Sequence, residues 1–317
     1  MTRKALITGC AGFIGSHLTQ RLLREGLHVI GVDGFLDNYD VALKLRNLSL
    51  IGNHPLFIFH SSMLSERRWE QWLEEVDLVF HLAALPGVRT SWGKAFSDYV
   101  IHNLIATQSL LDACTQIKRS PKIIVSSSSS VYGTMKEGLT GEQSPKHPIS
   151  PYGVTKAAME DICRVYVETF HLPVVILRYF TVYGPRQRPD MAFQQFFRQI
   201  HRGESVTLYG DGQQSRDFTY VSDATEANLL AAKYGEPGDV FNIGGEREIK
   251  LLEVLELMGE LTAHTPKLVH APPVPGDSRR TCADISLARS KLGYQPQVKL
   301  EEGLRLQWEE IRAQLKA

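Results

Sequence analysis

Tyr152 and Lys156 are the residues whose types and spacing best suit acid–base chemistry. They occur in the segment SPYGVTK, four residues apart, so both side chains point the same way if the segment is helical. A tyrosine acts as a general base only if its pKa falls from about 10 toward neutrality, which takes roughly 4 kcal/mol. The Lys156 ammonium is one source of that stabilisation. By itself, however, such a pair on an amphipathic helix is common and usually inert.

A run of five serines precedes this pair in the segment SSSSSVYG, Ser126 to Gly133. Serine runs usually belong to flexible linkers. This run instead follows the β-branched segment KIIV and leads into an apolar and an aromatic residue, which is typical of the end of a buried strand. We therefore expect the run to deliver hydroxyl groups to the edge of a sheet.

Three glycines separate the first predicted strand from the first predicted helix in LITGCAGFIGSHL. Gly9 permits the tight turn, Gly12 lets backbone approach a pyrophosphate, and Gly15 allows close packing of helix on strand, while the helix N-terminus attracts the anion. Asp33 ends the second predicted strand, where its carboxylate can accept hydrogen bonds from both ribose hydroxyls. Asp33 would also repel a 2′-phosphate, and Gly34 behind it supplies no cation. The pattern favours NAD over NADP, and the positive nicotinamide ring of NAD would act together with Lys156 to lower the pKa of Tyr152.

The elements that must position these residues are short β-branched runs that alternate with amphipathic helices. The runs KALITG, HVIGVD, LFIFH, LVFHLAA, KIIVSSS and VVILRYF predict buried parallel strands, and FIGSHLTQRLLREG and SPYGVTKAAMEDICRVYVETF predict helices. The alternation predicts an α/β fold with a Rossmann-type doubly wound parallel sheet. We assign residues 1–180 to this NAD-binding domain, with a returning strand near 239–245. Residues 181–317 form mainly a smaller α/β substrate lobe.

The composition excludes several classes of function. Thirty-five basic residues balance thirty-five acidic ones among 317 residues, without long like-charge runs, so we expect no nucleic-acid partner. No apolar run approaches the ~20 residues of a membrane helix, and the N-terminal one is too short for a signal peptide. The four cysteines lack CxxC spacing and neighbouring histidines, so we expect no disulfide, no metal site and a reducing cytoplasm. The expected partner is a small molecule.

Six segments occur together in an order that is typical of one enzyme family: TGCAGFIGSH, HLAALPGV, SSSSSVYG, PYGVTK, LRYFTVYGPRQRPDM and YGDGQQSRDFTYVSD. Over nearly its whole length the chain resembles the extended short-chain dehydrogenases/reductases of the NAD-dependent epimerase/dehydratase family, which modify nucleotide sugars. Within that family the UDP-glucuronate 4-epimerases are the most similar. The resemblance implies tightly bound NAD that is regenerated in each turnover, a UDP-sugar substrate and a homodimer packed through helices of the large domain.

The resemblance also implies roles for individual residues. Ser128 matches the hydroxyl that hydrogen-bonds the substrate O4 and relays its proton to Tyr152, and Lys156 completes the catalytic set. Met63 is expected against the adenine ring, because FHSSML offers Ser62 where many relatives have an acidic residue. The expected cofactor-binding residues are Gly9, Gly12, Phe13, Ile14, Gly15, Asp33, Met63, Leu82, Ala83, Ala84, Asn103, Tyr152, Lys156 and Tyr179.

Two further serines bear on which reaction follows. Family members begin alike: a tyrosine takes the proton from a sugar hydroxyl while NAD takes the hydride, which leaves a 4-keto sugar. Dehydratases and decarboxylases of the family carry carboxylates before VYG for a second step, whereas this chain has Ser129 and Ser130, which we expect to contact the substrate. A hydroxyl near its ordinary pKa cannot replace a carboxylate as the base for elimination at C5. The expected reaction is 4-epimerisation of UDP-glucuronate to UDP-galacturonate.

The uronic acid is indicated by Thr181 and Arg188 in RYFTVYGPRQRPDM. They resemble the pair that holds the C6 carboxylate in glucuronate epimerases, whereas galactose-type epimerases usually have Asn in place of the threonine. One arginine and a hydroxyl suffice to offset the desolvation of a buried carboxylate. We hypothesise that the pair also keeps the carboxylate out of the orientation in which a 4-ketouronate loses CO2.

The nucleotide is expected to be held mainly by arginines. Arg216 in QQSRDF matches the family's nucleotide-binding arginine, Arg89 in PGVRTSW is a second candidate, and Asp277 is the acid of the GD pair. The family's later arginine, three residues before that acid, is absent, and Arg279 or Arg280 are candidates to replace it. The arginine fork binds phosphate oxygens in pairs, which suits a clamp that stays closed while the sugar turns over.

Four alternatives stay open. A UDP-glucose 4-epimerase, or an epimerase with both activities, would share the catalytic residues, and a UDP-glucuronate decarboxylase would share the first step. A net oxidoreductase would exchange its NAD. A nucleotide-sensing module that had lost catalysis is disfavoured, because Ser128, Tyr152 and Lys156 are all present.

Overall fold

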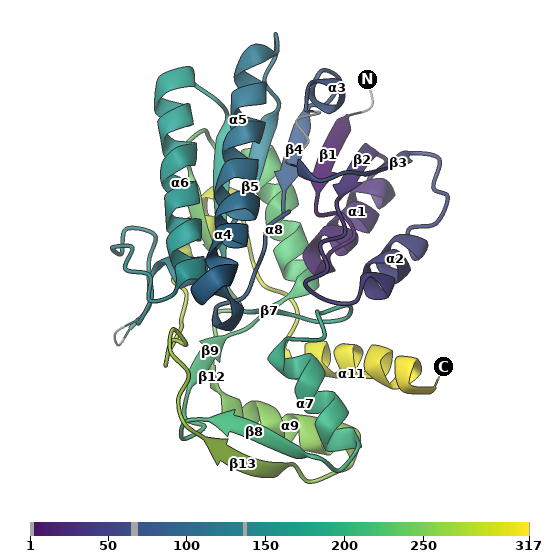
Figure 1. Ribbon diagram of the computed structural model, residues 1–317, viewed down its shortest axis with the longest axis vertical. Coiled ribbons are helices and arrows are strands. Elements are labelled where there is room, and N and C mark those ends of the chain that lie inside the picture. The colour runs from purple at the N-terminus through teal and green to yellow at the C-terminus, as the bar shows by residue number, and fades with distance from the viewer. Residues whose placement is uncertain (1–2, 65–68, 136–137, 317) are drawn as a thin grey trace.

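The computed structural model, which describes residues 3–64, 69–135 and 138–316, is built on a seven-stranded sheet (Figure 1). The strand order is β11-β6-β5-β4-β1-β2-β3, and every neighbouring pair is parallel. In that order the strands are Val240–Ile243, Val174–Tyr179, Lys122–Ser128, Leu78–His81, Lys4–Thr8, His28–Asp33 and Phe57–Ser61. All six β-branched runs enter this sheet, so the predicted doubly wound fold is confirmed.

Helices cover both faces of the sheet, and the alternation of side chains along β5 shows how. Ile123 and Val125 join the apolar cluster of α5 (Ala106–Gln116) and α6 (Pro151–Phe170). Ile124, between them, joins the cluster of α1 (Phe13–Arg24) and α8 (Val221–Tyr234) on the other face. Strands buried on both faces read as continuous apolar runs for this reason. Figure 1 shows α5 and α6 side by side in front of the sheet.

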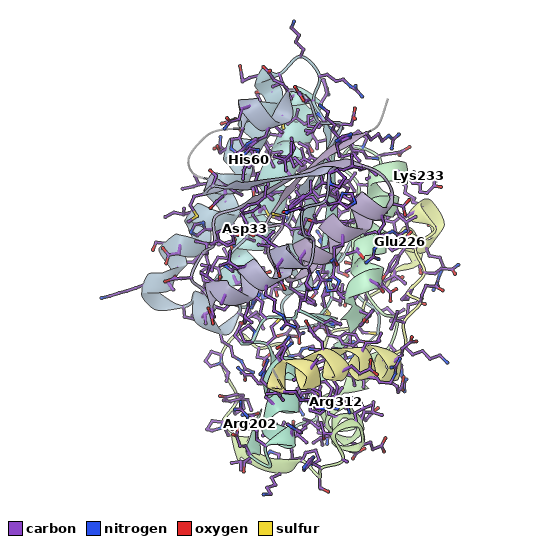
Figure 2. The ribbon with its side chains drawn as sticks, turned by 90° about the vertical axis from the view of Figure 1, so that its right-hand side faces the viewer. Asp33, His60, Arg202, Glu226, Lys233 and Arg312 are labelled. Atoms are coloured by element: carbon purple, nitrogen blue, oxygen red, sulfur yellow. The ribbon has the colours of Figure 1, made fainter. Side chains whose placement is uncertain are left out.

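The remaining elements connect the strands or build the lobe below the sheet (Figure 1). The connecting elements are α2 (Val41–Ser49), α3 (Glu70–Leu73), α4 (Phe96–Tyr99), a π-helical turn at Val100–Ile105 and 3-10 turns at Arg89–Ser91, Gly93–Ala95 and Ser129–Val131. The lobe pairs β7 (Val182–Tyr183) with β10 (Thr219–Tyr220), β8 (Ser205–Tyr209) with β13 (Lys267–Ala271), and β9 (Ser215–Asp217) with β12 (Glu248–Lys250). Its helices are α7 (Ala192–His201), α9 (Leu251–Thr262), α10 (Ser286–Leu292) and α11 (Leu300–Lys316); Figure 2 shows α11 crossing the molecule above the lower part of the lobe.

The order of the strands determines where a ligand can enter. From β1 the chain proceeds through β2 and β3 toward one edge, then crosses back to β4 on the other side of β1. Loops that leave β1 and β4 therefore diverge, and the crevice between their carboxyl ends is the usual binding position in such sheets. Those ends carry the glycine loop after Thr8 and the segment after His81.

The described part of the chain contains neither a membrane-spanning helix nor a cluster of metal-binding side chains. None of its helices is long and apolar enough to cross a membrane. Within the same residues, no group of three or more His, Cys, Asp or Glu side chains could hold a metal ion.

Candidate active site

The glycine loop makes the turn from β1 into α1. Gly9 has a φ of 74°, in the left-handed region that favours glycine, and its amide donates to the Val32 carbonyl at 2.8 Å. A Cβ on Gly15 would lie 2.0 Å from the Gly9 carbonyl oxygen, so a side chain at position 15 would push α1 off the strand. Gly12 caps α1 without a side-chain hydrogen bond. The first amides of a helix have no partner within the helix, so those of α1 can bind an anion.

A cavity opens above this loop, at the carboxyl ends of the central strands. Its lining joins residues that lie far apart in the sequence, from the glycine loop at Gly9 to Arg188. Every expected cofactor residue except Asn103 belongs to it: Gly9, Gly12, Phe13, Ile14, Gly15, Asp33, Met63, Leu82, Ala83, Ala84, Tyr152, Lys156 and Tyr179.

This lining fits NAD at both the pyrophosphate and the adenosine positions. The glycine loop offers backbone amides where a Cβ would obstruct, as described above. Asp33 accepts hydrogen bonds from the amides of Ala11 at 3.1 Å and Phe35 at 2.9 Å, yet its carboxylate still faces the cavity. The Met63 sulfur lies 2.1 Å from where a Cβ on Gly34 would be, so the thioether can lie beside Asp33 only because Gly34 has no side chain.

Lys44 is a lining residue that the sequence reading missed. It extends from α2 and donates to Asn38 Oδ1 at 3.0 Å and to the Leu36 carbonyl. Burial raises the pKa of Asp33, and the positive charge of Lys44 opposes that rise. Gly34 supplies no cation, as expected, but the fold places one beside Asp33 from a separate helix.

Asn103 lies next to the cavity rather than in its lining. It belongs to the π-helical turn and is 1% exposed. Its amide donates to the Leu85 carbonyl and to Thr155 Oγ, both at 3.0 Å, and its carbonyl accepts from the Leu85 amide at 2.8 Å. These contacts tie the segment after β4 to α6 and use both amide hydrogens, so they favour a positioning role over the direct contact that was expected. The neighbouring His102 lines the cavity instead, and no spacing in the sequence signals it.

Helix α6 begins where the sequence predicts. Ser150 is its N-cap, and the serine hydroxyl accepts a hydrogen bond from the Gly153 amide at 3.1 Å. Pro151 occupies the first turn, where its missing amide hydrogen costs nothing. Tyr152 therefore stands in the first turn and Lys156 one turn later, and both line the cavity.

Strand β5 ends opposite this helix and completes the catalytic group. Ser128 hydrogen-bonds Tyr152, and the Ser128 hydroxyl also donates to Ser130 Oγ at 3.1 Å. Lys156 Nζ donates to the Ser126 carbonyl at 2.8 Å. The structure thus brings the three expected catalytic residues together from two elements.

Burial dominates the electrostatics of the site. Burial raises the pKa of Tyr152 above its usual value, and the Ser128 hydrogen bond and the charge of Arg188 oppose that rise only in part. Burial lowers the pKa of Lys156 to about 8, against the influence of Glu160. The charges of the protein therefore do not bring Tyr152 to neutrality by themselves. A further positive charge in the cavity is needed before Tyr152 can act as a base.

A buried ion pair lies beneath the catalytic group. Arg178 of β6 donates to the Glu160 carboxylate of α6 through Nε at 2.9 Å and Nη2 at 2.7 Å. The Ser127 hydroxyl donates to the same carboxylate at 2.5 Å, and Arg178 Nη1 donates to the Tyr132 hydroxyl at 2.7 Å. The strand that carries the serines is thereby fixed relative to the helix that carries Tyr152.

Carboxylates for a second chemical step are absent from the lining as the structure describes it. Asp33 is the acidic residue among the described lining residues, and two backbone amides already bind it. Ser129 and Ser130 are half-buried in the 3-10 turn after β5 and lie outside the lining, to which Ser126 and Ser127 belong instead. Substrate contact by Ser129 and Ser130 stays a prediction.

Arg188 lines the cavity, with its guanidinium bound to Asp190. Thr181 is half-buried just before β7, and its carbonyl accepts a hydrogen bond from the Thr219 amide. The described residues include no hydrogen bond between Thr181 and Arg188, so their joint grip on a carboxylate stays a prediction.

The expected nucleotide clamp meets at one carboxylate. Arg216 Nη2 donates to Asp277 Oδ1 at 2.6 Å, and Arg89 Nη2 donates to Asp277 Oδ2 at 3.2 Å. Arg279 and Arg280 form separate ion pairs with other acids of the lobe. Arg89 and Arg216 are therefore side by side, whereas the two candidate replacements for the missing arginine are engaged elsewhere.

Comparisons with known proteins agree with this geometry. The model of the NAD dependent epimerase/dehydratase family matches residues 5–244. A UDP-glucuronate 4-epimerase of Thermodesulfobacterium geofontis is 33% identical over 305 residues, which cover 95% of this chain and 93% of that protein. An uncharacterised UDP-glucose epimerase of Bacillus subtilis is 44% identical over 95% of each chain. The crystal structure of UDP-glucuronic acid 4-epimerase from Bacillus cereus with UDP-glucuronic acid and NAD has a TM-score of 0.94 and 42% identity, over 98% of this chain and 99% of that one. The chain belongs to the NAD-dependent epimerase/dehydratase family.

Proposed function

We propose that this protein is a UDP-glucuronate 4-epimerase, which interconverts UDP-glucuronate and UDP-galacturonate and retains NAD as its cofactor. One observation carries the proposal. The chain matches, over nearly its whole length, an enzyme crystallised with UDP-glucuronic acid and NAD. The cavity described above supports it, because Tyr152 and Lys156 line the cavity and Ser128 hydrogen-bonds Tyr152.

The residues of the chain divide the work of the first step. When bound, NAD supplies a hydride acceptor and donor and the positive charge that the side chains lack. Tyr152 in its ionised form accepts the proton of the C4 hydroxyl, and Ser128, hydrogen-bonded to Tyr152, is placed to relay it. Lys156, held on the Ser126 carbonyl, keeps a positive charge next to the tyrosine. For the return step the same proton goes back from Tyr152 to the sugar oxygen.

The sugar must then be reduced rather than altered further. No second-step carboxylate stands beside Tyr152 in the described lining, so abstraction of the C5 proton lacks a base. The arginines that meet at Asp277 are proposed to hold the diphosphate while the sugar turns over. Arg188 and Thr181 are proposed to hold the C6 carboxylate, with Ser129 and Ser130 at the sugar.

A second candidate is 4-epimerisation of UDP-glucose, alone or beside the uronate reaction. The Bacillus subtilis relative carries that description. The ion pair of Arg188 with Asp190 also favours UDP-glucose as a substrate. Asp190 neutralises the positive charge of Arg188, which would otherwise favour a sugar with a negatively charged C6 group. Decarboxylation of UDP-glucuronate is the third candidate.

The test is incubation of purified protein with UDP-glucuronate or UDP-glucose, without added NAD, with products followed by NMR. We expect UDP-galacturonate as the sole product from UDP-glucuronate. The Tyr152→Phe variant should lose at least ~100-fold in kcat, because the general base is removed. Failure of the wild-type protein to convert UDP-glucuronate, or a pentose product, would contradict the proposal.

Three coarser proposals accompany this one. The division into a cofactor domain (residues 1–180, with the strand near 239–245) and a substrate lobe (181–317) follows the arrangement of the cavity and the nucleotide arginines. A cytoplasmic, reducing location suits four free cysteines, all of them buried. A homodimer is supported by exposed apolar side chains on neighbouring helices, as argued in the Discussion.

A further inference from the structure

Arg188 presents only part of its guanidinium to the cavity. Its Nε and Nη2 donate to the two carboxylate oxygens of Asp190 at 3.0 and 2.8 Å. Arg188 lines the cavity with a side chain that is 16% exposed, whereas Asp190 lies outside the lining and is 49% exposed. A guanidinium has five N–H donors in one plane. The pair with Asp190 occupies the Nε edge and leaves the edge formed by Nη1 and Nη2 for a second acceptor.

We propose that Asp190 is a positioning and specificity-determining residue, which holds Arg188 side-on toward the sugar C6 group and cancels its charge. This inference rests on the proposed function and deepens it, because it concerns how the site treats an anionic C6 group compared with a neutral one. The uronate carboxylate would bind the free edge of the arginine while Asp190 keeps the other.

The charges explain why Asp190 matters for specificity. Arg188 and Asp190 together are neutral, so a substrate carboxylate gives the three groups a net charge of −1. With a neutral residue at position 190, the positive charge of Arg188 would balance the negative charge of the substrate carboxylate. Asp190 therefore weakens the attraction for a carboxylate but has little effect on a C6 hydroxyl. Two charges about 4 Å apart change binding by somewhat less than tenfold if water separates them and by far more near a protein surface, so we expect an effect of at least roughly tenfold here.

The same charges act on the catalytic tyrosine. Tyr152 is faced by Arg188 and by Tyr99 from α4, and Lys156 follows one turn later on the helix that carries Tyr152. Around Arg188 the other titratable groups are Asp190, Tyr39 and Lys44. Without the negative charge of Asp190, the positive charge of Arg188 would be unbalanced. A stronger positive charge near Tyr152 favours the ionised form of the tyrosine.

The backbone around Asp190 lets a conservative variant isolate the charge. The Met191 amide donates to the Arg188 carbonyl at 3.1 Å, and Gln195 Nε2 donates to the Asp190 carbonyl at 3.2 Å. Neither contact uses the carboxylate. Asp190→Asn keeps an oxygen that can accept from Arg188 and removes the charge, whereas Asp190→Ala removes both.

The experiment measures kcat and KM of Asp190→Asn for UDP-glucuronate and for UDP-glucose across pH, with dissociation constants for both nucleotides from calorimetry. We expect the KM and dissociation constant for UDP-glucuronate to fall by at least roughly tenfold, with less than about twofold change for UDP-glucose. The acid limb of kcat/KM should move to lower pH with both sugars. Asp190→Ala should lower kcat with both, because Arg188 loses its support.

The matched control is Glu168→Gln. Glu168 also accepts two hydrogen bonds from one arginine, Arg164, at 3.0 and 2.9 Å, but this pair is exposed on the outside of α6. The Glu168→Gln variant should leave the kcat, KM and dissociation constants for both nucleotides, and the pH profile, unchanged. Equal effects of Asp190→Asn on the two sugars, or none, would overturn the inference. If the wild type converts only UDP-glucose, the proposed function fails, while the ratio of the two dissociation constants still decides the role of Asp190.

Discussion

The proposed chemistry depends on how Tyr152 becomes a base. Tyr152 is surrounded by groups that act in opposite directions: burial raises its pKa, while Ser128 and Arg188 lower it. Lys156 is less strongly charged than a surface lysine, because burial brings its pKa to about 8. Both groups are therefore tuned by desolvation as much as by partners, and the pH range in which Lys156 stays cationic is narrow.

This tuning predicts an alkaline limit set by Lys156. The lysine is charged below about pH 8 and loses its charge above it, so kcat/KM should decline as pH rises through about 8. Lys156→Arg keeps the charge to higher pH and should move that decline upward. Lys156→Met should lower kcat by about 10²–10⁴ at every pH. A pH profile of kcat/KM for the three proteins tests this, and an alkaline limb common to the wild type and Lys156→Arg would contradict it.

At the scale of elements, β5, α6 and β6 are fastened where the catalytic residues emerge. Glu160 accepts from Arg178 of β6 and Ser127 of β5, and Arg178 also reaches Tyr132. Arg178 and Glu160 are 6% and 3% exposed, so the pair is sheltered from water. Its hydrogen bonds satisfy both charged groups, which a buried ion pair requires.

Removal of one partner of this ion pair should lower the stability of the fold. Arg178→Met leaves a buried carboxylate without its cation, and we expect unfolding free energy to fall by about 3–5 kcal/mol. Urea unfolding followed by circular dichroism measures this. Arg164→Met, which breaks the exposed pair with Glu168, should leave the free energy of unfolding nearly unchanged, because water screens this pair. Similar losses for the two variants would show that the buried pair does not hold the elements together.

At the scale of the whole molecule, one outer face combines α6 with the π-helical turn at Val100–Ile105 that leads into α5. Apolar side chains stand exposed there on adjoining helices: Ile101 at 38%, Ile105 at 50%, Val154 at 46% and Val165 at 47%. Figure 1 shows these helices side by side. An apolar face shared by two helices suits a second copy of the same face, because a two-fold axis pairs it with itself.

The prediction at this scale concerns oligomeric state. Light scattering coupled to size-exclusion chromatography should give the mass of a dimer for the wild type. The double variant Ile105→Asp and Val165→Asp should shift the protein toward the monomer, because it places charges in an apolar interface. Leu139→Asp, at a residue 64% exposed in a loop, is the matched control and should leave the mass unchanged. A monomeric wild type would refute the proposal.

Local spacing was sufficient to predict the glycine turn, the helix that carries Tyr152 and Lys156, and the strands of the sheet. Gly9, Gly12 and Gly15 act within one turn, and Tyr152 and Lys156 share a helix face by the period of the helix alone. Such relations depend on a few neighbouring dihedral angles, so they can be read from order and residue type. The β-branched runs identified the sheet for the same reason.

Contacts between distant segments were decided only by the tertiary structure. The positive charge of Lys44, on α2, acts on Asp33 at the end of β2. Asn103 supports the cavity wall from a π-helical turn, which the pattern of apolar residues does not predict. The raised pKa of Tyr152 reflects burial by the whole fold rather than its distance from Lys156. Even the short spacing of Arg188 and Asp190 did not reveal that one side chain lines the cavity and the other lies behind it. Packing sets burial and the direction of side chains, and packing is a property of the assembled chain.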